Sequence, residues 1–178
     1  MISLAIRSAC ALFFVAIPMM ACAADDCKLV SFDEVKQALP ELTAWKPPQS
    51  ADVGNCQFIT DPLKGMNLLV FNTSVNPSKE YADREFASHR DDHARDAVPE
   101  LAGLGDRAYL SQYYPGGMEI MAQKDGQILQ ISVNFKDPIK PSQISAIAKL
   151  GQTVLLSYAE LYAKKQKAKQ DQEAGEDR

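Results

Sequence analysis

The fold is decided by residues 101–135, which read LAGLGDRAYLSQYYPGGMEIMAQKDGQILQISVNF. Turn residues divide this stretch twice, at Tyr113 to Gly117 and at Asp125-Gly126. An Asp-Gly pair between two alternating segments is a strong hairpin signal, because both central residues of a type I′ turn need positive φ. The stretch therefore predicts a three-stranded antiparallel meander.

The last segment of the meander alternates strictly between apolar and polar residues. Its apolar positions are Leu129, Ile131, Val133 and Phe135, and its polar positions are Gln130, Ser132 and Asn134. The preceding segment follows the same pattern except at Met121, which interrupts the polar side. Because successive side chains of a strand point to opposite faces, the pattern predicts a sheet with one covered face and one face in contact with solvent.

Two more strands and three helices are expected around the meander. We predict strands at 56–60 and 66–73, of which the second is apolar enough to lie in the middle of the sheet. The capping box Ser31–Glu34 begins the first helix, a second helix is expected at 77–97, and a third with a wide apolar face begins at Pro141. The predicted fold class is α+β, in the order α-ββ-α-βββ-α, with helices packed on a mostly antiparallel sheet of about five strands.

The chain is predicted to consist of a leader, one domain and a tail. Its 178 residues suit a single hydrophobic core. Residues 1–24 combine one Arg, an apolar run and small residues before a cleavage point, as a signal peptide does, so we expect export to the periplasm. Residues 25–163 form the expected α+β domain. Residues 164–178 are charged without an apolar face, which predicts a helix that frays into disorder.

Cys22 leaves a second mode of export open. The sequence Met19 to Cys22 is a loose version of a lipoprotein signal, so the protein is either cleaved after Ala23 or Ala24 or anchored to the outer membrane by an acylated Cys22. The formal net charge is −4, and loss of Arg7 with the leader makes it more negative. We therefore expect no nucleic-acid partner, and membrane attachment only if Cys22 is acylated.

Cys27 and Cys56 remain in the mature chain as an evident pair. Thiols do not stay reduced in an oxidising compartment, so we predict a Cys27–Cys56 disulfide that joins the mature N-terminus to the first strand. The alternative is two separate buried thiols.

Three motifs resemble those of a broad class of small exported bacterial proteins and lipoproteins of unknown function. They are the N-terminal Cys27, the Cys56-Gln57-Phe58 strand and the motif Gly-Leu-Gly-Asp-x-Ala, which occupies 103–108 here. Some members are similar to the α/β/α sandwich of the Mog1/PsbP type. The resemblance implies that fold and a binding role at the cell envelope, and it implies no particular functional residue.

Two motifs suggest chemistry without completing a site. His89 and His93 are four residues apart on a helix and could share a metal, but the mature chain offers no third His or spare Cys to complete a zinc site. The glycines at 103 and 105 follow a helix and precede a strand, which is the reverse of a dinucleotide-binding loop, so they indicate a tight turn. We expect no cofactor.

Three aromatic residues are candidates for a protein-binding surface. Tyr113 and Tyr114 lie at a predicted hairpin tip, where they offer a large contact area for little loss of side-chain entropy. The alternative interpretation makes one of them core and the other an incidental surface residue. Trp45, the only Trp, precedes Pro47-Pro48 and is either a cover over the core or an exposed binding residue.

The sequence contains no recognisable catalytic motif. There is no Ser-centred elbow, no His-Cys pair and no pair of acids in an apolar setting. We expect a non-enzymatic protein of the cell envelope that binds another protein as an accessory or inhibitor. The alternative is a periplasmic carrier of a small apolar ligand held between the sheet and the 77–97 helix, and a hydrolase assembled in space is a third possibility.

Overall fold

The computed structural model describes residues 27–42, 45–46, 48, 51–52, 54–60, 66–76, 78–92 and 100–176. The predicted signal peptide and Cys22 lie outside the described residues. No helix in these ranges is long and apolar enough to cross a membrane.

Three helices and six strands make up the described part of the chain. They are α1 (Phe32–Ala38), β1 (Ala51–Asp52), β2 (Asn55–Ile59), β3 (Leu68–Val75), α2 (Lys79–Asp92), β4 (Arg107–Tyr114), β5 (Gly117–Lys124), β6 (Gln127–Asn134) and α3 (Pro141–Glu176). The α+β class and the predicted order are confirmed, and the two-residue β1 adds an edge strand that the sequence did not reveal.

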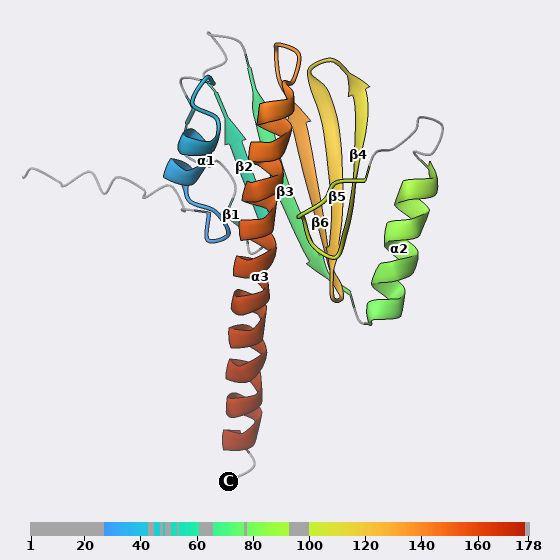
Figure 1. Ribbon diagram of the computed structural model, residues 1–178. Coiled ribbons are helices and arrows are strands. Elements are labelled where there is room, and N and C mark those ends of the chain that lie inside the picture. Colours follow the sequence, from blue (N-terminus) through green and yellow to red (C-terminus); the bar gives the residue numbers. More distant parts are fainter. Residues whose placement is uncertain are drawn as a thin grey trace, which may run out of the picture.

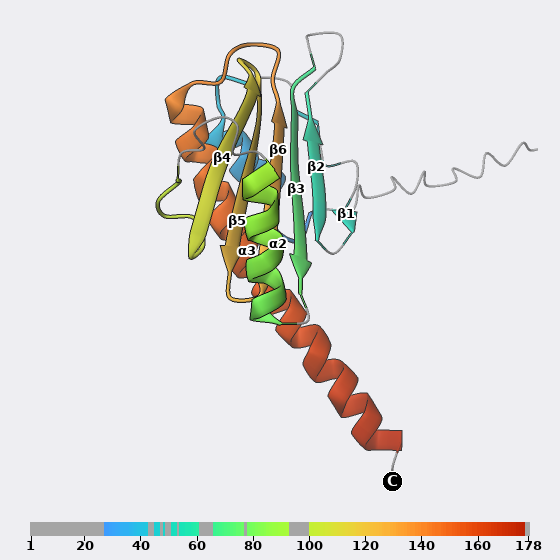
Figure 2. The same cartoon turned by 90° about the vertical axis from the view of Figure 1, so that its right-hand side faces the viewer.

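All six strands belong to one antiparallel sheet in the order β1-β2-β3-β6-β5-β4. The meander β4-β5-β6 forms one half of the sheet, and β3 pairs with β6 over its whole length. The nearly apolar β3 therefore lies in the middle of the sheet, as predicted. Helices cover both faces, with α1 and α3 on one side and α2 on the other (Figures 1 and 2).

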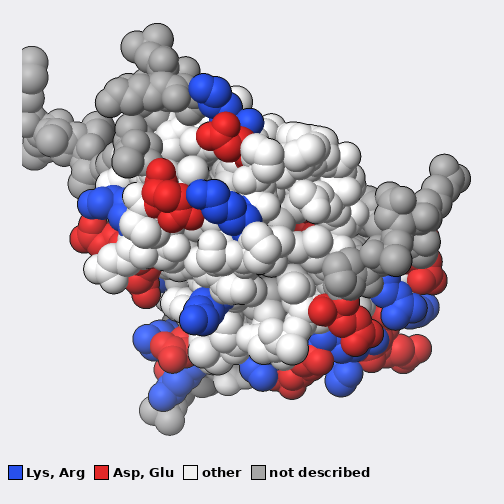
Figure 3. Space-filling view, turned by 45° about the horizontal axis from the view of Figure 1, so that its top comes forward, with Lys and Arg blue, Asp and Glu red and all other residues white. Residues whose placement is uncertain are grey.

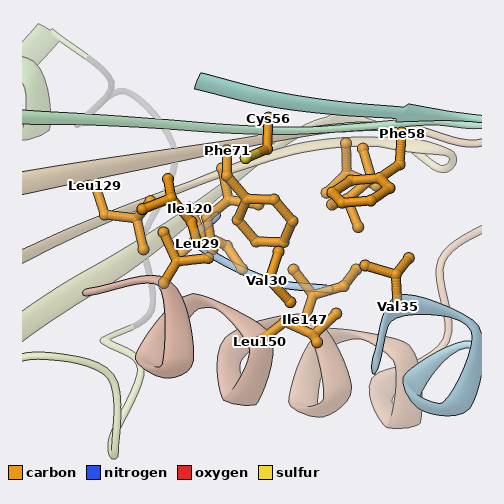
Figure 4. Close-up of a cluster of buried hydrophobic side chains, with 14 of the residues drawn as sticks. Leu29, Val30, Val35, Cys56, Phe58, Phe71, Ile120, Leu129, Ile147 and Leu150 are labelled. Carbon is orange, nitrogen blue, oxygen red and sulfur yellow. The ribbon is translucent and has the colours of Figure 1, made fainter. Parts of the chain in front are cut away.

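The larger core lies between the sheet and the pair α1 and α3. Alternate residues of β2, β3 and the meander point into it, and α3 contributes its wide apolar face (Figure 4). The labelled members of this core are Leu29, Val30, Val35, Cys56, Phe58, Phe71, Ile120, Leu129, Ile147 and Leu150. Burial of so many apolar side chains is the main stabilising contribution to the fold.

A smaller core lies on the opposite face, under α2. Ala82 and Phe86 of the helix pack with Tyr109, Met121 and Ile128 of the sheet. The expectation that this face meets only solvent is therefore wrong where α2 covers it. Met121, which interrupts the polar pattern, is buried because it lies beneath this helix.

The N-terminal segment is attached to the sheet by a disulfide and a capped helix. The structure contains the Cys27–Cys56 disulfide, with the two Cα atoms 5.7 Å apart. The Ser31 hydroxyl accepts from the Glu34 backbone N–H at 3.2 Å, and the Glu34 carboxylate accepts from the Ser31 backbone N–H at 2.7 Å. The predicted capping box is thus formed, and α1 begins where the sequence indicates.

The turns of the meander differ from the prediction in detail. Asp125 has a positive φ of 48°, but Gly126 does not have one, so the turn is not the expected type I′. Gly103 and Gly105 both have positive φ, which supports a structural role for these glycines. The Asp106 carboxylate accepts from the Asp125 backbone N–H at 3.0 Å and so links two turns.

Helix α3 continues to Glu176 and leaves the domain at its C-terminal end (Figures 1 and 2). The sequence predicted a helix that frays from Lys164. The structure differs, because it shows an unbroken helix over 36 residues. Side chains 162–172 are all exposed, so no contact with the sheet holds this part of the helix in place.

Candidate functional site

The candidate site is the tip of the β4–β5 hairpin. Tyr113 and Tyr114 end β4, and their side chains are 54% and 47% exposed. Both side chains are thus available at the surface. The alternative interpretation, in which one of the two belongs to the core, is wrong. Residues 108–118 contain no charged side chain. An uncharged area between groups of acidic and basic side chains is visible when the top of the molecule is turned forward (Figure 3).

Backbone contacts hold the hairpin tip in one position. The Ile139 N–H donates to the Pro115 carbonyl at 2.8 Å, and the Phe135 N–H donates to the Gly116 carbonyl at 2.7 Å. The ring of Tyr114 lies against Gly117, where a Cβ would collide with it. Gly117 is therefore required for the position of Tyr114, and the tip is ordered before any partner arrives.

A hollow of about 400 Å³ lies beside the two tyrosines. Its walls are formed by Gln112, Tyr113, Tyr114, Pro115, Pro138 and Ile139. Aromatic and proline side chains of this kind offer rigid, largely apolar contact area that loses little entropy on binding.

Tyr113 connects the tip to the polar side of the sheet. Its hydroxyl is hydrogen-bonded with Ser111 and Glu119, and Glu119 also accepts from Gln130 Nε2 at 2.8 Å. Partial burial, together with the negative charge of Glu119, raises the pKa of Tyr113 above its usual value. The phenol therefore stays neutral at physiological pH and can act as a hydrogen-bond donor.

Figure 2 shows that α2 covers only part of this face of the sheet and leaves β2 and β3 uncovered. The strand register places Ser132 beside Glu119 and Val70 beside Ser132. These side chains are only partly buried. A partner bound at the tip could thus extend over a surface that mixes polar side chains with apolar ones such as Val70.

Trp45 is not part of this surface. Its side chain is only 8% exposed, and its ring meets the edge of Phe135 with centroids 6.4 Å apart. Its backbone pairs with Thr60. The hypothesis that Trp45 is a binding residue is wrong, and the alternative of a cover over the core is correct.

The structure does not assemble a metal site from the residues it describes. His89 lies on α2, whereas His93 lies outside the described residues. No group of three or more His, Cys, Asp or Glu side chains with the geometry to hold a metal ion occurs in the described ranges.

A polar cluster between α2 and the sheet was not evident in the sequence. Asp83 accepts from Arg107 at 2.8 Å and from Gln123 Nε2 at 2.7 Å, and Arg107 also donates to Gln123. The hydrogen bond from Gln123, with further contributions from Lys79 and Arg107, lowers the pKa of Asp83. The members come from three elements, so no spacing along the chain could have revealed the cluster.

A cavity of about 280 Å³ lies next to this cluster. It is bounded by Phe86 and Arg90 of α2 and by residues 100–109, which include the two glycines of the Gly-Leu-Gly-Asp motif. The cavity combines apolar walls with two Arg and two acidic side chains.

No protein-family model, curated protein or solved structure matches this chain. The site is therefore interpreted from its own geometry.

Proposed function

We propose that this protein is a non-enzymatic binding module of the cell envelope that contacts another protein through the hairpin tip and the adjoining polar sheet face. The observation that carries the proposal is the pair of exposed, ordered tyrosines at 113 and 114 beside a hollow on an uncharged surface. Tyrosines are enriched among the residues that dominate binding energy in protein interfaces. An accessory or inhibitory role suits a surface of this kind.

The proposed location is the periplasm, after cleavage of the leader. The disulfide supports an oxidising compartment, and the composition of residues 1–24 supports export. Attachment to the outer membrane through an acylated Cys22 is the alternative, which mass spectrometry of the mature protein distinguishes by the added acyl chains. The resemblance to small exported proteins of unknown function, some of the Mog1/PsbP type, points in the same direction.

The experiment is a crosslinking capture from periplasmic extract with the tagged mature protein. The Tyr113→Ala/Tyr114→Ala variant removes both rings of the tip. The matched control is Tyr81→Ala/Tyr162→Ala, which removes two other exposed tyrosines, from α2 and α3. We expect one protein to be captured by the wild type and by the control, but not by the tip variant. Equal capture by all three proteins would contradict the proposal.

The cavity beside Phe86 favours a second candidate function, the transport of a small apolar ligand. Its volume of about 280 Å³ suffices only for a small molecule. Native mass spectrometry of the purified protein should then show a bound mass that is lost from Ala102→Trp, because the indole would fill the cavity from its rim. A protein that carries no added mass in either form would exclude this function.

A further inference from the structure

Strand β4 lies at an edge of the sheet, and its outer side is paired only near its start (Figures 1 and 2). Its inner side pairs with β5. On the outer side, Glu100 forms an antiparallel bridge with Tyr109, and the Leu101 N–H donates to the Ala108 carbonyl at 3.0 Å. Among the residues that the structure describes, no backbone group pairs with this outer side beyond Tyr109.

The alternation of a strand shows which backbone groups of β4 are directed outward. The Ala108 carbonyl faces Leu101, on the side away from β5. The backbone groups of Gln112, four residues on, face the same way, and those of Ser111 face β5. The regular pairing with β5 reaches Gln112, and the register shifts only after it. Gln112 therefore offers an N–H donor and a carbonyl acceptor to a strand outside the sheet.

This part of the edge lacks the protection that exposed edge strands usually carry. Charged side chains and Pro are two common means by which proteins prevent unwanted pairing at a sheet edge. Residues 108–114 contain neither a charged side chain nor Pro. The edge is therefore suited to receive an additional strand.

The hollow of about 400 Å³ at the hairpin tip adjoins this edge. Gln112, Tyr113 and Tyr114 belong to β4 and also form walls of the hollow, together with Pro138 and Ile139. A strand that pairs with Gln112 brings one of its own side chains to these walls. An aromatic or aliphatic side chain suits them, because none of the residues that line the hollow is charged.

We propose that the partner of the hairpin tip presents an extended, uncharged peptide segment that adds a strand to β4 beside Gln112. This inference rests on the proposed function, since it names the part of the partner that the tip binds. The segment runs antiparallel to β4, as residues 100–101 do, so its first residues lie at the hollow. In strand addition the main-chain hydrogen bonds provide affinity, and pockets for side chains provide specificity.

A peptide segment fits this edge better than a second copy of the chain. Residues 110–114 span only roughly 17 Å as a strand. A stable interface between two proteins buries about 800 Å² on each partner, which two such short edges do not provide by pairing with each other. An extended peptide needs no more than the edge and the hollow.

The test uses random peptides displayed on phage as the probe and the mature protein as the bait. The affinity of an enriched peptide is then measured by fluorescence anisotropy for Gln112→Pro and Gln112→Ala. Both variants lose the side chain, but only Pro also loses the outward N–H. We expect Gln112→Pro to bind at least about tenfold more weakly than Gln112→Ala. Equal affinities, or a library from which no peptide is enriched, would overturn the inference.

Hydrogen exchange in the wild type tests the same contact without a substitution, so the inference stays testable even where Gln112→Pro does not fold. The Gln112 amide should exchange more slowly once the peptide is bound. The Ser111 amide, which faces β5 in the free protein, is the control and should change little. An unchanged exchange rate at Gln112 would overturn the inference.

Competition separates the failure of this inference from the failure of the proposed function. The enriched peptide should displace the protein that the wild type captures from periplasmic extract. A protein that needs Tyr113 and Tyr114 for capture but is not displaced by the peptide would overturn strand addition and leave the proposed function intact. Capture of no protein would overturn both.

Sedimentation of the mature protein alone distinguishes the remaining occupant of the edge. We expect the mass of a single chain. A dimer that Gln112→Pro dissociates would show that a second copy pairs with β4, and it would overturn the inference.

Discussion

The guanidinium carbon of Arg107 lies 4.7 Å from the centroid of the Phe86 ring. Arg107 is at the start of β4 and Phe86 is on α2, so this contact attaches the helix to the edge of the meander. The same guanidinium donates hydrogen bonds to Asp83 and to Gln123. The polar cluster of Asp83, Arg107 and Gln123 therefore joins α2 to the sheet beside the small apolar core.

Asp83 should make the stability of the fold depend on pH in the acid range. Its pKa is lowered in the folded state, mainly by the hydrogen bond from Gln123. A depressed pKa stabilises the fold above the pKa of the unfolded state, and this contribution is lost as pH falls through the folded-state pKa. We expect the difference in unfolding free energy between wild type and Asp83→Asn to be constant above about pH 5 and to shrink below about pH 4.

Chemical denaturation at several pH values measures this difference. Asp91→Asn, which replaces an exposed acid on the same helix, is the control. If the unfolding free energies of wild type and Asp83→Asn differed by the same amount at neutral and at acid pH, the ionised Asp83 would not stabilise the fold.

Glu119→Gln should lower the pKa of Tyr113. The negative charge of Glu119 contributes to the raised pKa of this phenol, and the substitution removes that charge while keeping a polar side chain. Absorbance of tyrosinate against pH, with the matching Tyr113→Phe proteins subtracted, isolates this group. Identical titration curves for Tyr113 in wild type and Glu119→Gln would show that the two side chains do not interact.

Gly117→Ala should destabilise the hairpin tip. The added Cβ would collide with the exposed Tyr114 ring and displace it from its position, at a cost of about 1 kcal/mol. Gly126→Ala is the control, because the nearest atoms to its added Cβ are 3.9 Å away. Urea unfolding of both variants measures the costs, and equal values would mean that Gly117 is not required for the position of Tyr114.

Cys56→Ala should lower the melting temperature under oxidising conditions. The disulfide joins residues 29 apart, and closing a loop of this size stabilises a fold by roughly 3 kcal/mol in the chain-entropy model. In reductant, wild type and variant should melt alike. If Cys56→Ala and wild type had the same melting temperature under oxidising conditions, the disulfide would add no stability.

The local sequence was sufficient to predict the elements whose structure depends only on contacts between residues close together in the chain. Ser31 and Glu34 are three residues apart and form the capping box within one turn. The alternation from Leu129 to Phe135 needs only the geometry of a strand to select its buried face. The order of helices and strands was evident for the same reason, whereas the cysteine pair followed from the expected compartment and the two cysteines left in the mature chain.

Tertiary structure decided the features that depend on what packs against an element. Met121 breaks the polar pattern because it is covered by α2, which lies some 30 to 40 residues earlier in the chain. The pattern of residues within β5 does not show which helix covers this strand. Trp45 was ambiguous until Phe135 was seen beside it. The sequence by itself determined the three helices and the five longer strands, and which face each of these strands buries in the larger core. Only the folded chain decided which part of the opposite face stays open, because that depends on contacts between residues far apart in the sequence.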